Sequence, residues 1–256
     1  MKLAMICQTR TGSQLLKTLL NSHPAVQVYP YEAFYPVLRE GGFYKFWADR
    51  VAEDPKSIIL SAHMNDLLRE WADSVRAMYP GKRVIGYDIK LEQIEWLPKG
   101  RKLLRSIPFS YLHLIRRNRL RSIVSEAVMY KRIAAGDTQV HRDKVPEIET
   151  VELAADRVVE KITKRIDLDA EAERLFGRGE RPYMQVYYED LADEHTRDDT
   201  LDEIFQFAGV NPSRATKETS LKKQNPHALS DLIENYQAIE RALRGTPHES
   251  MLAEGV

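Results

Sequence analysis

Residues that could bind an anion gather near the start of the chain, in the loop Gln8-Thr9-Arg10-Thr11-Gly12-Ser13. An apolar run, Leu3–Cys7, precedes this loop and leucines at helical spacing follow it, so the pattern predicts a buried strand, a loop and a helix. The N–H groups at a helix N-terminus are unpaired and carry the positive end of the dipole, which suits an anion. Arg10 adds a planar fork of donors that fits phosphate or sulfate oxygens, and Gly12 allows close approach of the backbone.

A strand-to-helix turn in which Ser13 only caps the helix is the other interpretation of this loop. The loop also lacks the G-x-x-x-x-G-K-[ST] pattern of nucleotide triphosphatases, because it has one glycine and the residue after Gly12 is not lysine. The loop alone therefore indicates an anion without identifying it.

A second basic junction follows the apolar run Leu112–Ile115, where the stretch 116–121 contains four arginines and leads into another helical pattern. Arginines at a helix N-terminus oppose the dipole, so a bound anion is favoured over a solvated basic turn. Arg117 and Ser125 are eight residues apart, about two helical turns, which a long arginine side chain can bridge. Two anion sites at strand ends suggest a ligand with two separated phosphate-like groups.

Strand and helix patterns alternate along the chain, which predicts an α/β fold with a mostly parallel central sheet flanked by helices, in a single domain over residues 1–256. A helical cap is expected around 40–80, and a mobile loop or an exposed connection around 136–149. The expected strands are Lys2–Cys7, Val26–Tyr29, Arg83–Ile89, Tyr111–Ile115 and Tyr183–Tyr187. The expected helices are Ser13–Leu20, Lys56–Met78, Leu120–Ala135, Thr150–Phe176, Asp199–Phe207 and Leu229–Arg244.

The overall composition argues against several classes of protein. Lysine plus arginine and aspartate plus glutamate each number 38, and this net charge near zero argues against a nucleic-acid binder or a basic membrane-surface protein. The single cysteine, Cys7, rules out an internal disulfide and a thiolate metal cluster. No apolar stretch is long enough to span a bilayer. We therefore expect a cytoplasmic protein with no metal and no stable membrane insertion.

Taken in order, these motifs resemble the sulfotransferases that use 3′-phosphoadenosine 5′-phosphosulfate (PAPS). Their 5′-phosphosulfate loop is similar to Arg10-Thr11-Gly12-Ser13-Gln14-Leu15-Leu16, commonly with serine in place of Thr11 and threonine in place of Gln14. Their 3′-phosphate motif, an arginine followed eight residues later by a serine, resembles Arg117 through Ser125. The two departures leave the backbone cradle intact but change its side-chain donors.

Two later segments extend the resemblance. Tyr187-Tyr188-Glu189-Asp190-Leu191 is similar to the family's Tyr-Glu-Asp-Leu segment, in which the tyrosine, here Tyr188, can lie near the adenine. Leu221-Lys222-Lys223-Gln224-Asn225 resembles a late basic loop that closes over the cofactor. A strand end with acidic helix-starting residues and a solvated basic turn are the alternative interpretations of these two segments.

The resemblance implies a P-loop-like sulfotransferase fold, PAPS as donor and adenosine 3′,5′-bisphosphate (PAP) as product. It implies in-line transfer of the sulfuryl group to a hydroxyl or amine of a small-molecule or glycan acceptor, without a metal. Arg10 and the amides of Gly12 to Gln14 would hold the leaving group. A nucleotide kinase or other phosphotransferase, and a non-catalytic nucleotide-binding module, are the alternatives.

Glu32 and Lys90 are the main candidates for the remaining catalytic roles. Glu32 lies in an aromatic, proline-rich segment, and a carboxylate in an apolar pocket has the raised pKa that suits a general base. Some bacterial carbohydrate sulfotransferases resemble this chain in using a glutamate at about this distance from the loop; an ordinary loop acid is the alternative. Lys90, at a strand end, would hold the transferring group or would pair with Asp88 or Glu92 on the surface. His63 and His113 are weaker candidates.

Two apolar patterns have more than one interpretation. The aromatic-rich stretch 29–47 suits either an acceptor-binding wall or a core beneath a cap. The apolar stripe on Leu229–Arg244 suits internal packing or a homodimer contact.

Overall fold

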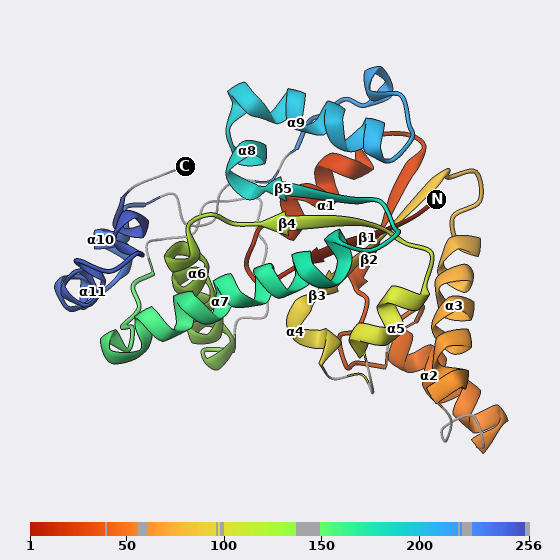
Figure 1. Ribbon diagram of the computed structural model, residues 1–256, viewed down its shortest axis with the longest axis horizontal. Coiled ribbons are helices and arrows are strands. Elements are labelled where there is room, and N and C mark those ends of the chain that lie inside the picture. The colour runs from red at the N-terminus through yellow and green to blue at the C-terminus, as the bar shows by residue number, and fades with distance from the viewer. Residues whose placement is uncertain are drawn as a thin grey trace.

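The computed structural model describes residues 1–38, 40–55, 61–95, 97, 100–136, 149–219, 221 and 227–253, without the side chains of 61–63, 103 and 106. These residues form one five-stranded sheet in the order β2-β3-β1-β4-β5 (Figure 1). Every pairing is parallel, so the predicted α/β fold with a parallel sheet is confirmed. The strands are β1 (Lys2–Cys7), β2 (Val26–Glu32), β3 (Val84–Lys90), β4 (Ser110–Ile115) and β5 (Tyr183–Tyr187).

Helices join the strands and continue beyond the last of them. They are α1 (Ser13–Asn21), α2 (Phe43–Glu53), α3 (Ser61–Ala77), α4 (Leu91–Ile94), α5 (Gly100–Ser106), α6 (Arg119–Ala134), α7 (Val158–Ala172), α8 (Tyr188–Ala192), α9 (Glu194–Phe207), α10 (Leu229–Leu232) and α11 (Tyr236–Leu243). Short 3₁₀ turns occupy Ala155–Arg157, Pro212–Arg214 and Glu249–Leu252, and a π turn occupies Glu173–Gly177.

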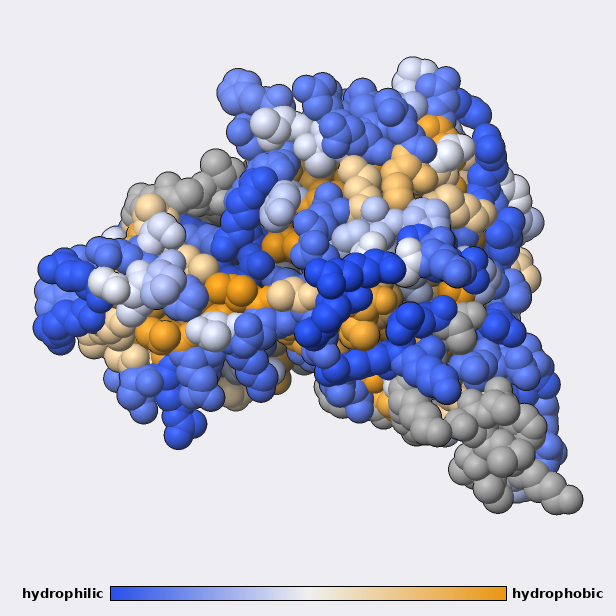
Figure 2. All heavy atoms as spheres, in the orientation of Figure 1, coloured by the Kyte–Doolittle hydropathy of each residue, from blue (hydrophilic) through white to orange (hydrophobic). Residues whose placement is uncertain are grey.

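The two faces of the sheet are covered by different helices because successive side chains of a strand point to opposite faces. Leu3, Met5 and Cys7 of β1 pack with α1, α8 and α9. Ala4 and Ile6 pack on the other side, with α3, α5 and the end of α7. Buried on both faces, β1 reads as a continuous apolar run. In Figure 2 the outer faces of the helices are mostly hydrophilic, as expected for helices that bury one side.

A third apolar cluster joins α6 and α7 to α10 and α11, which lie at the left of Figure 1. Here two predicted helices are wrong in part. Val151 pairs with Ile233 in an isolated bridge, so the predicted helix Thr150–Phe176 begins as α7 only at Val158. The same bridge interrupts Leu229–Arg244, which divides into α10 and α11. Asn235 fixes the break by bonding both backbone groups of Leu153, at 3.1 and 2.7 Å.

The stretch expected to form a cap contains α2 and α3, and residues 56–60 lie outside the described residues. Phe34, Phe43 and Trp71 are buried against one another at centroid distances of 5.4 to 5.9 Å, in the core beneath the sheet. Tyr31 and Tyr35 of the same aromatic stretch are 43% and 46% exposed. The stretch therefore supplies core side chains and also presents aromatic rings to solvent. The expected loop at 136–149 falls outside the described residues at 137–148.

Candidate active site

The candidate site lies at the edge of the sheet where the parallel strands end. The register places Cys7 beside Lys90 of β3 and Leu114 of β4. Because β1 lies between β3 and β4, the segments that follow these three strands meet at this edge. Crevices of this kind, outside the carboxyl ends of the strands, are where open α/β sheets bind ligands.

The β1–α1 loop, residues 8–12, is held in an unusual backbone shape. Arg10 and Gly12 have φ values of 62° and 91°, in the left-handed region. Gly12 is also in close contact with Tyr188, because a Cβ built on Gly12 would lie 2.2 Å from Tyr188 Cδ2. The hydroxyl of Thr11 donates to the carbonyl of Gln8 at 2.6 Å, which closes the turn.

The start of α1 has no side-chain cap. Gly12 is the N-cap residue, and Ser13 is the first helical residue, so Ser13 does not cap the helix in the way the simpler interpretation requires. The free N–H groups of the first turn remain available to an anion. Gln14 and Leu15 lie in this first turn and are partly exposed.

Two residues that were not predicted to belong to the site, Glu92 and Arg165, hold the start of the loop in place. Glu92 accepts hydrogen bonds from the backbone N–H and the hydroxyl of Thr9, at 3.0 and 3.1 Å. Arg165 donates to the carbonyl of Thr9 at 3.2 Å, and its own carbonyl accepts from Gln8 Nε2 at 2.7 Å. These partners are 83 and 156 residues from Thr9 along the chain, so no local pattern indicates them.

Lys90 is buried directly beneath this loop, with 3% of the residue exposed. Its Nζ donates to Ser13 Oγ at 2.6 Å and to Asp88 Oδ1 at 2.8 Å. Burial alone would lower the pKa of Lys90, but the charge of Asp88, with help from Cys7 and Glu32, outweighs burial and raises it. The amine is therefore charged throughout the neutral range. Of the two expected partners, Asp88 does pair with Lys90, but in the interior rather than on the surface. The expected pairing with Glu92 is wrong, since Glu92 binds Thr9.

Glu32 ends β2 beside Lys90. Its Oε2 accepts from Gln93 Nε2 at 2.5 Å, and its Oε1 is 3.9 Å from Lys90 Nζ. The side chain is 32% exposed. Glu32 therefore does not lie in the predicted apolar pocket, because it has polar neighbours on one side and solvent on the other. Its carboxylate is accessible to an acceptor group.

Arginines surround the other side of the loop. Arg10 Nε donates to Ser125 Oγ at 3.0 Å, and Arg116 donates to the carbonyl of Arg10 at 3.2 Å. The Arg116 guanidinium lies 4.6 Å from the centroid of the Tyr188 ring. Burial, and then the charges of Arg116 and Arg132, lower the pKa of Arg10 to about 10. A group of arginines whose charged forms are disfavoured in this way is chemically suited to an anion.

The two residues of the predicted 3′-phosphate motif bind different partners in the structure. Arg117 precedes the N-cap residue Asn118, and its guanidinium binds Asp190 through two hydrogen bonds of 2.6 and 3.0 Å. It also lies 3.9 Å over the ring of Tyr187. Ser125, one of the buried residues of α6, instead accepts the hydrogen bond from Arg10. The Arg117 side chain is half-exposed, so its guanidinium can exchange partners.

The remaining candidates lie elsewhere. Lys222 and Lys223 lie outside the described residues, as does the side chain of His63. His113 is fully buried and bonds Tyr183 Oη at 2.7 Å and Asp169 Oδ1 at 3.3 Å, as a core histidine does.

Cys7 is expected to resist alkylation in the folded protein. It is fully buried, and burial, opposed by Lys90 and supported by Asp88, raises the pKa of its thiol to about 12. The thiolate is the nucleophile, and its fraction at pH 8 falls about 1,000-fold below that of an ordinary cysteine. Iodoacetamide at pH 8 should leave the native chain unmodified by mass spectrometry and add one group in denaturant. Rapid native alkylation would contradict this burial.

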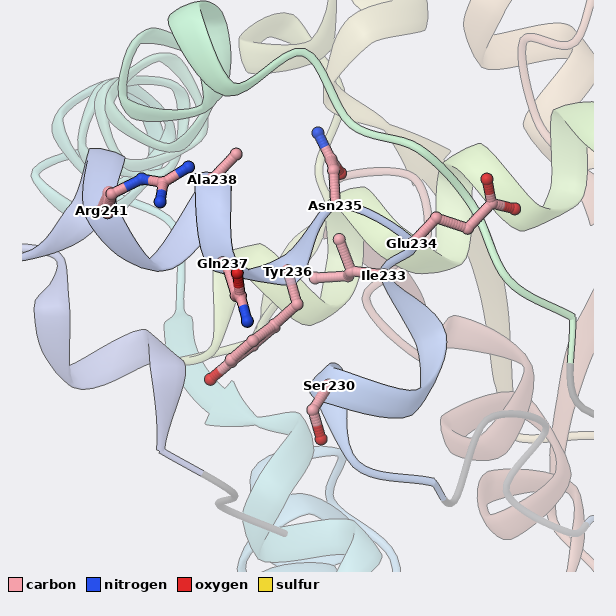
Figure 3. A pocket seen from close by; sticks show the side chains of 8 residues that line it. All are labelled: Ser230, Ile233, Glu234, Asn235, Tyr236, Gln237, Ala238 and Arg241. Carbon is pink, nitrogen blue, oxygen red and sulfur yellow. The ribbon is translucent and has the colours of Figure 1, made fainter.

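A hollow of about 480 Å³ lies apart from these residues, on the helices at the end of the chain (Figure 3). Its lining comes from α10, α11 and their connection, and includes none of the predicted site residues. The lining residues are Ser230, Ile233, Glu234, Asn235, Tyr236, Gln237, Ala238 and Arg241.

Two further properties concern metals and membranes. Across the described ranges, no group of three or more His, Cys, Asp or Glu side chains is arranged to hold a metal ion. None of the helices in the described part of the chain has both the length and the apolar character that crossing a bilayer requires.

The chain has matches among solved structures. No family model and no curated protein matches the chain. Among solved structures, the chain is similar to a sulfotransferase from Alicyclobacillus acidocaldarius, with 14% sequence identity and a TM-score of 0.48. The match covers 88% of this chain and 87% of that chain.

Proposed function

We propose that this protein is a sulfotransferase that moves a sulfuryl group from PAPS to a hydroxyl or amine of a small-molecule or glycan acceptor. One observation carries the proposal: a glycine-containing loop at a helix N-terminus meets a buried, charged lysine, an arginine and an accessible carboxylate at one sheet edge. The sequence motifs, which follow one another in the family's order, support the same conclusion.

The residues at the edge suit such a donor. The Tyr188 ring fills the space that a Cβ on Gly12 would need, so this position of the loop requires glycine. The Nε atoms of Arg116 and Arg121 are buried and have no hydrogen-bond partner among the described residues. Buried donors without partners are rare in folded proteins and favour an anionic ligand.

Each residue then has a role that follows from its position. PAPS, when bound, supplies an activated sulfuryl group whose leaving group is a phosphate. Arg10 and the N–H groups of Gly12 to Gln14 would bind and neutralise that phosphate, and Lys90 and Ser13 would stabilise charge where the bond breaks. Glu32 would accept the proton of the attacking hydroxyl or amine. Arg117 and Ser125 would hold the 3′-phosphate, and Tyr188, Lys222 and Lys223 the rest of the nucleotide.

The surroundings of Glu32 suit an acceptor that carries a ring. Tyr31 and Tyr35, both exposed, flank this carboxylate in the sequence. Aromatic faces bind sugar rings and apolar rings alike. Sugars and phenols are therefore the first acceptors to assay.

PAP binding without magnesium is the first test. We expect isothermal titration calorimetry to show binding to the wild type, and Arg117→Ala to weaken it at least 10-fold, since a charge-assisted bond contributes about 1.5–3 kcal/mol. Arg50→Ala on α2, which removes another exposed, ion-paired arginine, is the matched control and should bind normally.

Two other results would point to the alternatives. Lack of PAP binding by the wild type would overturn the sulfotransferase proposal. Tight binding of ATP that depends on magnesium, with no PAP binding, would instead favour a nucleotide kinase.

A further inference from the structure

A cluster of buried charges lies beneath the start of α1. Asp88 is 1% exposed, and the ammonium groups of Lys17 and Lys90 lie 3.2 Å from its Oδ2 and 2.8 Å from its Oδ1. We call these three residues the Lys17–Asp88–Lys90 cluster. Charged side chains are almost never this deeply buried unless they are paired, and removing one member leaves its partner uncompensated. A single substitution in this cluster should therefore change the protonation or the position of the members that remain.

Both ammonium groups also extend to the elements of the candidate site. Lys90 Nζ donates to Ser13 Oγ at 2.6 Å, at the end of the β1–α1 loop. Lys17 Nζ donates to the carbonyl of Pro30 at 3.2 Å, two residues before Glu32. The cluster therefore connects the helix that begins at the loop with the strand that carries Glu32.

The backbone of Asp88 makes the same connection a second time. Its carbonyl accepts the N–H of Ala33 at 2.7 Å, immediately after Glu32, and Asp88 pairs with Glu32 in the register of β2 and β3. Asp88 is thus bonded, directly or through a lysine, to the start of α1, which would face the donor, and to the end of β2, which would face the acceptor.

We propose that Asp88 is a positioning residue, whose carboxylate holds the Lys90 ammonium on Ser13 and, through Lys17 and its own carbonyl, sets the place of Glu32. This inference rests on the proposed function, in which Lys90 contacts the donor and Glu32 contacts the acceptor. The carboxylate of Asp88 is occupied by the two lysine ammonium groups, so Asp88 acts through them.

The groups that face Lys90 determine how it responds to the loss of Asp88. They are Asp88 on β3, the Cys7 thiol at 3.3 Å on β1, Ser13 on α1 and Glu32 at 3.9 Å on β2. Lys17, on α1, adds a second positive charge through Asp88. Without Asp88, the partly exposed Glu32 is the sole carboxylate among these groups, and burial then favours the neutral amine.

The decisive experiment is an NMR titration of lysine side chains, labelled with ¹³C and assigned with Lys90→Met. In the wild type, Lys90 should stay protonated up to at least its ordinary pKa of 10.5. In Asp88→Asn, the titration midpoint of Lys90 should fall by at least about 2 pH units. In Asp88→Glu, which keeps a carboxylate, the midpoint should lie close to that of the wild type. Asp73→Asn, which removes an exposed carboxylate 2.6 Å from Lys2, should leave Lys90 unchanged.

A second variant tests the link to Glu32. Lys17→Met removes the bond to Pro30 while Lys90 keeps its carboxylate. We expect release of PAP from PAPS, with water as acceptor, to fall at least 10-fold, with PAP affinity changed less than 2-fold. An equal loss of affinity and rate would contradict the proposed role of Lys17.

Failure of the positioning role of Asp88 and failure of the proposed function give different results. A Lys90 that titrates alike in wild type and Asp88→Asn overturns the positioning role, whatever the chain binds. If Asp88→Asn does not fold, Lys17→Met carries the test through PAP release and PAP affinity. Absence of PAP binding by the wild type overturns the proposed function, and the NMR titration still decides whether Asp88 controls Lys90.

Discussion

Gly12→Ala is expected to abolish PAP binding and to lower the free energy of unfolding by about 2–6 kcal/mol. Gly12 has a φ of 91°, a conformation that costs a residue with a Cβ about 1–3 kcal/mol. The added methyl group would also lie 2.2 Å from Tyr188 Cδ2, so the ring or the loop must move. Movement of the loop would shift the N–H groups that are proposed to bind the phosphate, and movement of the ring would displace Tyr188 from its proposed place beside the nucleotide. Chemical denaturation and calorimetry with PAP measure the two effects.

Gly81→Ala provides the matched control. Gly81 has a similar φ of 86°, but nothing lies within 4 Å of its Cβ position. It should show the cost of the backbone conformation alone and bind PAP normally. In a double-mutant cycle, Gly12→Ala should cost less stability in a Tyr188→Ala background than in the wild type, because the collision is absent there. If Gly12→Ala were as stable as Gly81→Ala and bound PAP as the wild type does, the loop would not be the anion site.

Glu32→Gln is expected to reduce sulfuryl transfer by about 10²–10⁴-fold, the usual contribution of a general base. The amide keeps the shape of the side chain and its bond with Gln93, but it cannot accept the acceptor's proton. Glu32 lies outside the groups proposed to hold the donor, so PAP affinity should change less than 2-fold. Release of PAP from PAPS with a panel of phenols, sugars and amines measures transfer.

This prediction also separates an enzyme from a binding module. Glu53→Gln, an exposed carboxylate on α2 paired with Arg50, is the control and should leave both readouts unchanged. Equal transfer by Glu32→Gln and wild type would exclude Glu32 as the base. A wild type that binds PAP but transfers to none of the acceptors would favour a nucleotide-binding module.

Much of the fold could be predicted from sequence because the three inner strands are buried on both faces. Their apolar runs place β1, β3 and β4 within a residue of their observed ends. The failures have two causes, contacts between distant segments and short helices. The bridge between Val151 and Ile233 converts predicted helix into extended backbone, and no local pattern reports it. The short helices α4, α5 and α8 have too few residues to show a period.

Part of the candidate site could also be predicted from the sequence. The loop, Glu32 and Lys90 were indicated by residue type and by position at strand ends, and the fold brings all three to one edge. The burial of Lys90 was misread, although a signal existed: Asp88 and Lys90 are two residues apart on a strand, so they share a face. The rotation of Arg117 toward Asp190, and the contact of Arg10 with Ser125, depend on tertiary packing that spacing alone does not encode.

The position of β1 in the middle of the sheet has a consequence for how the chain is made. β1 is synthesised before the two strands that complete its edges, β3 and β4, which begin at residues 84 and 110. During translation the apolar segment Leu3–Cys7 therefore leaves the ribosome well before either partner exists. Such delayed, non-local pairing is slow and leaves apolar surface open to aggregation. The nascent chain should thus be a client of ribosome-associated chaperones, and the β1–α1 loop should acquire its ligand-binding shape only after β4 has emerged.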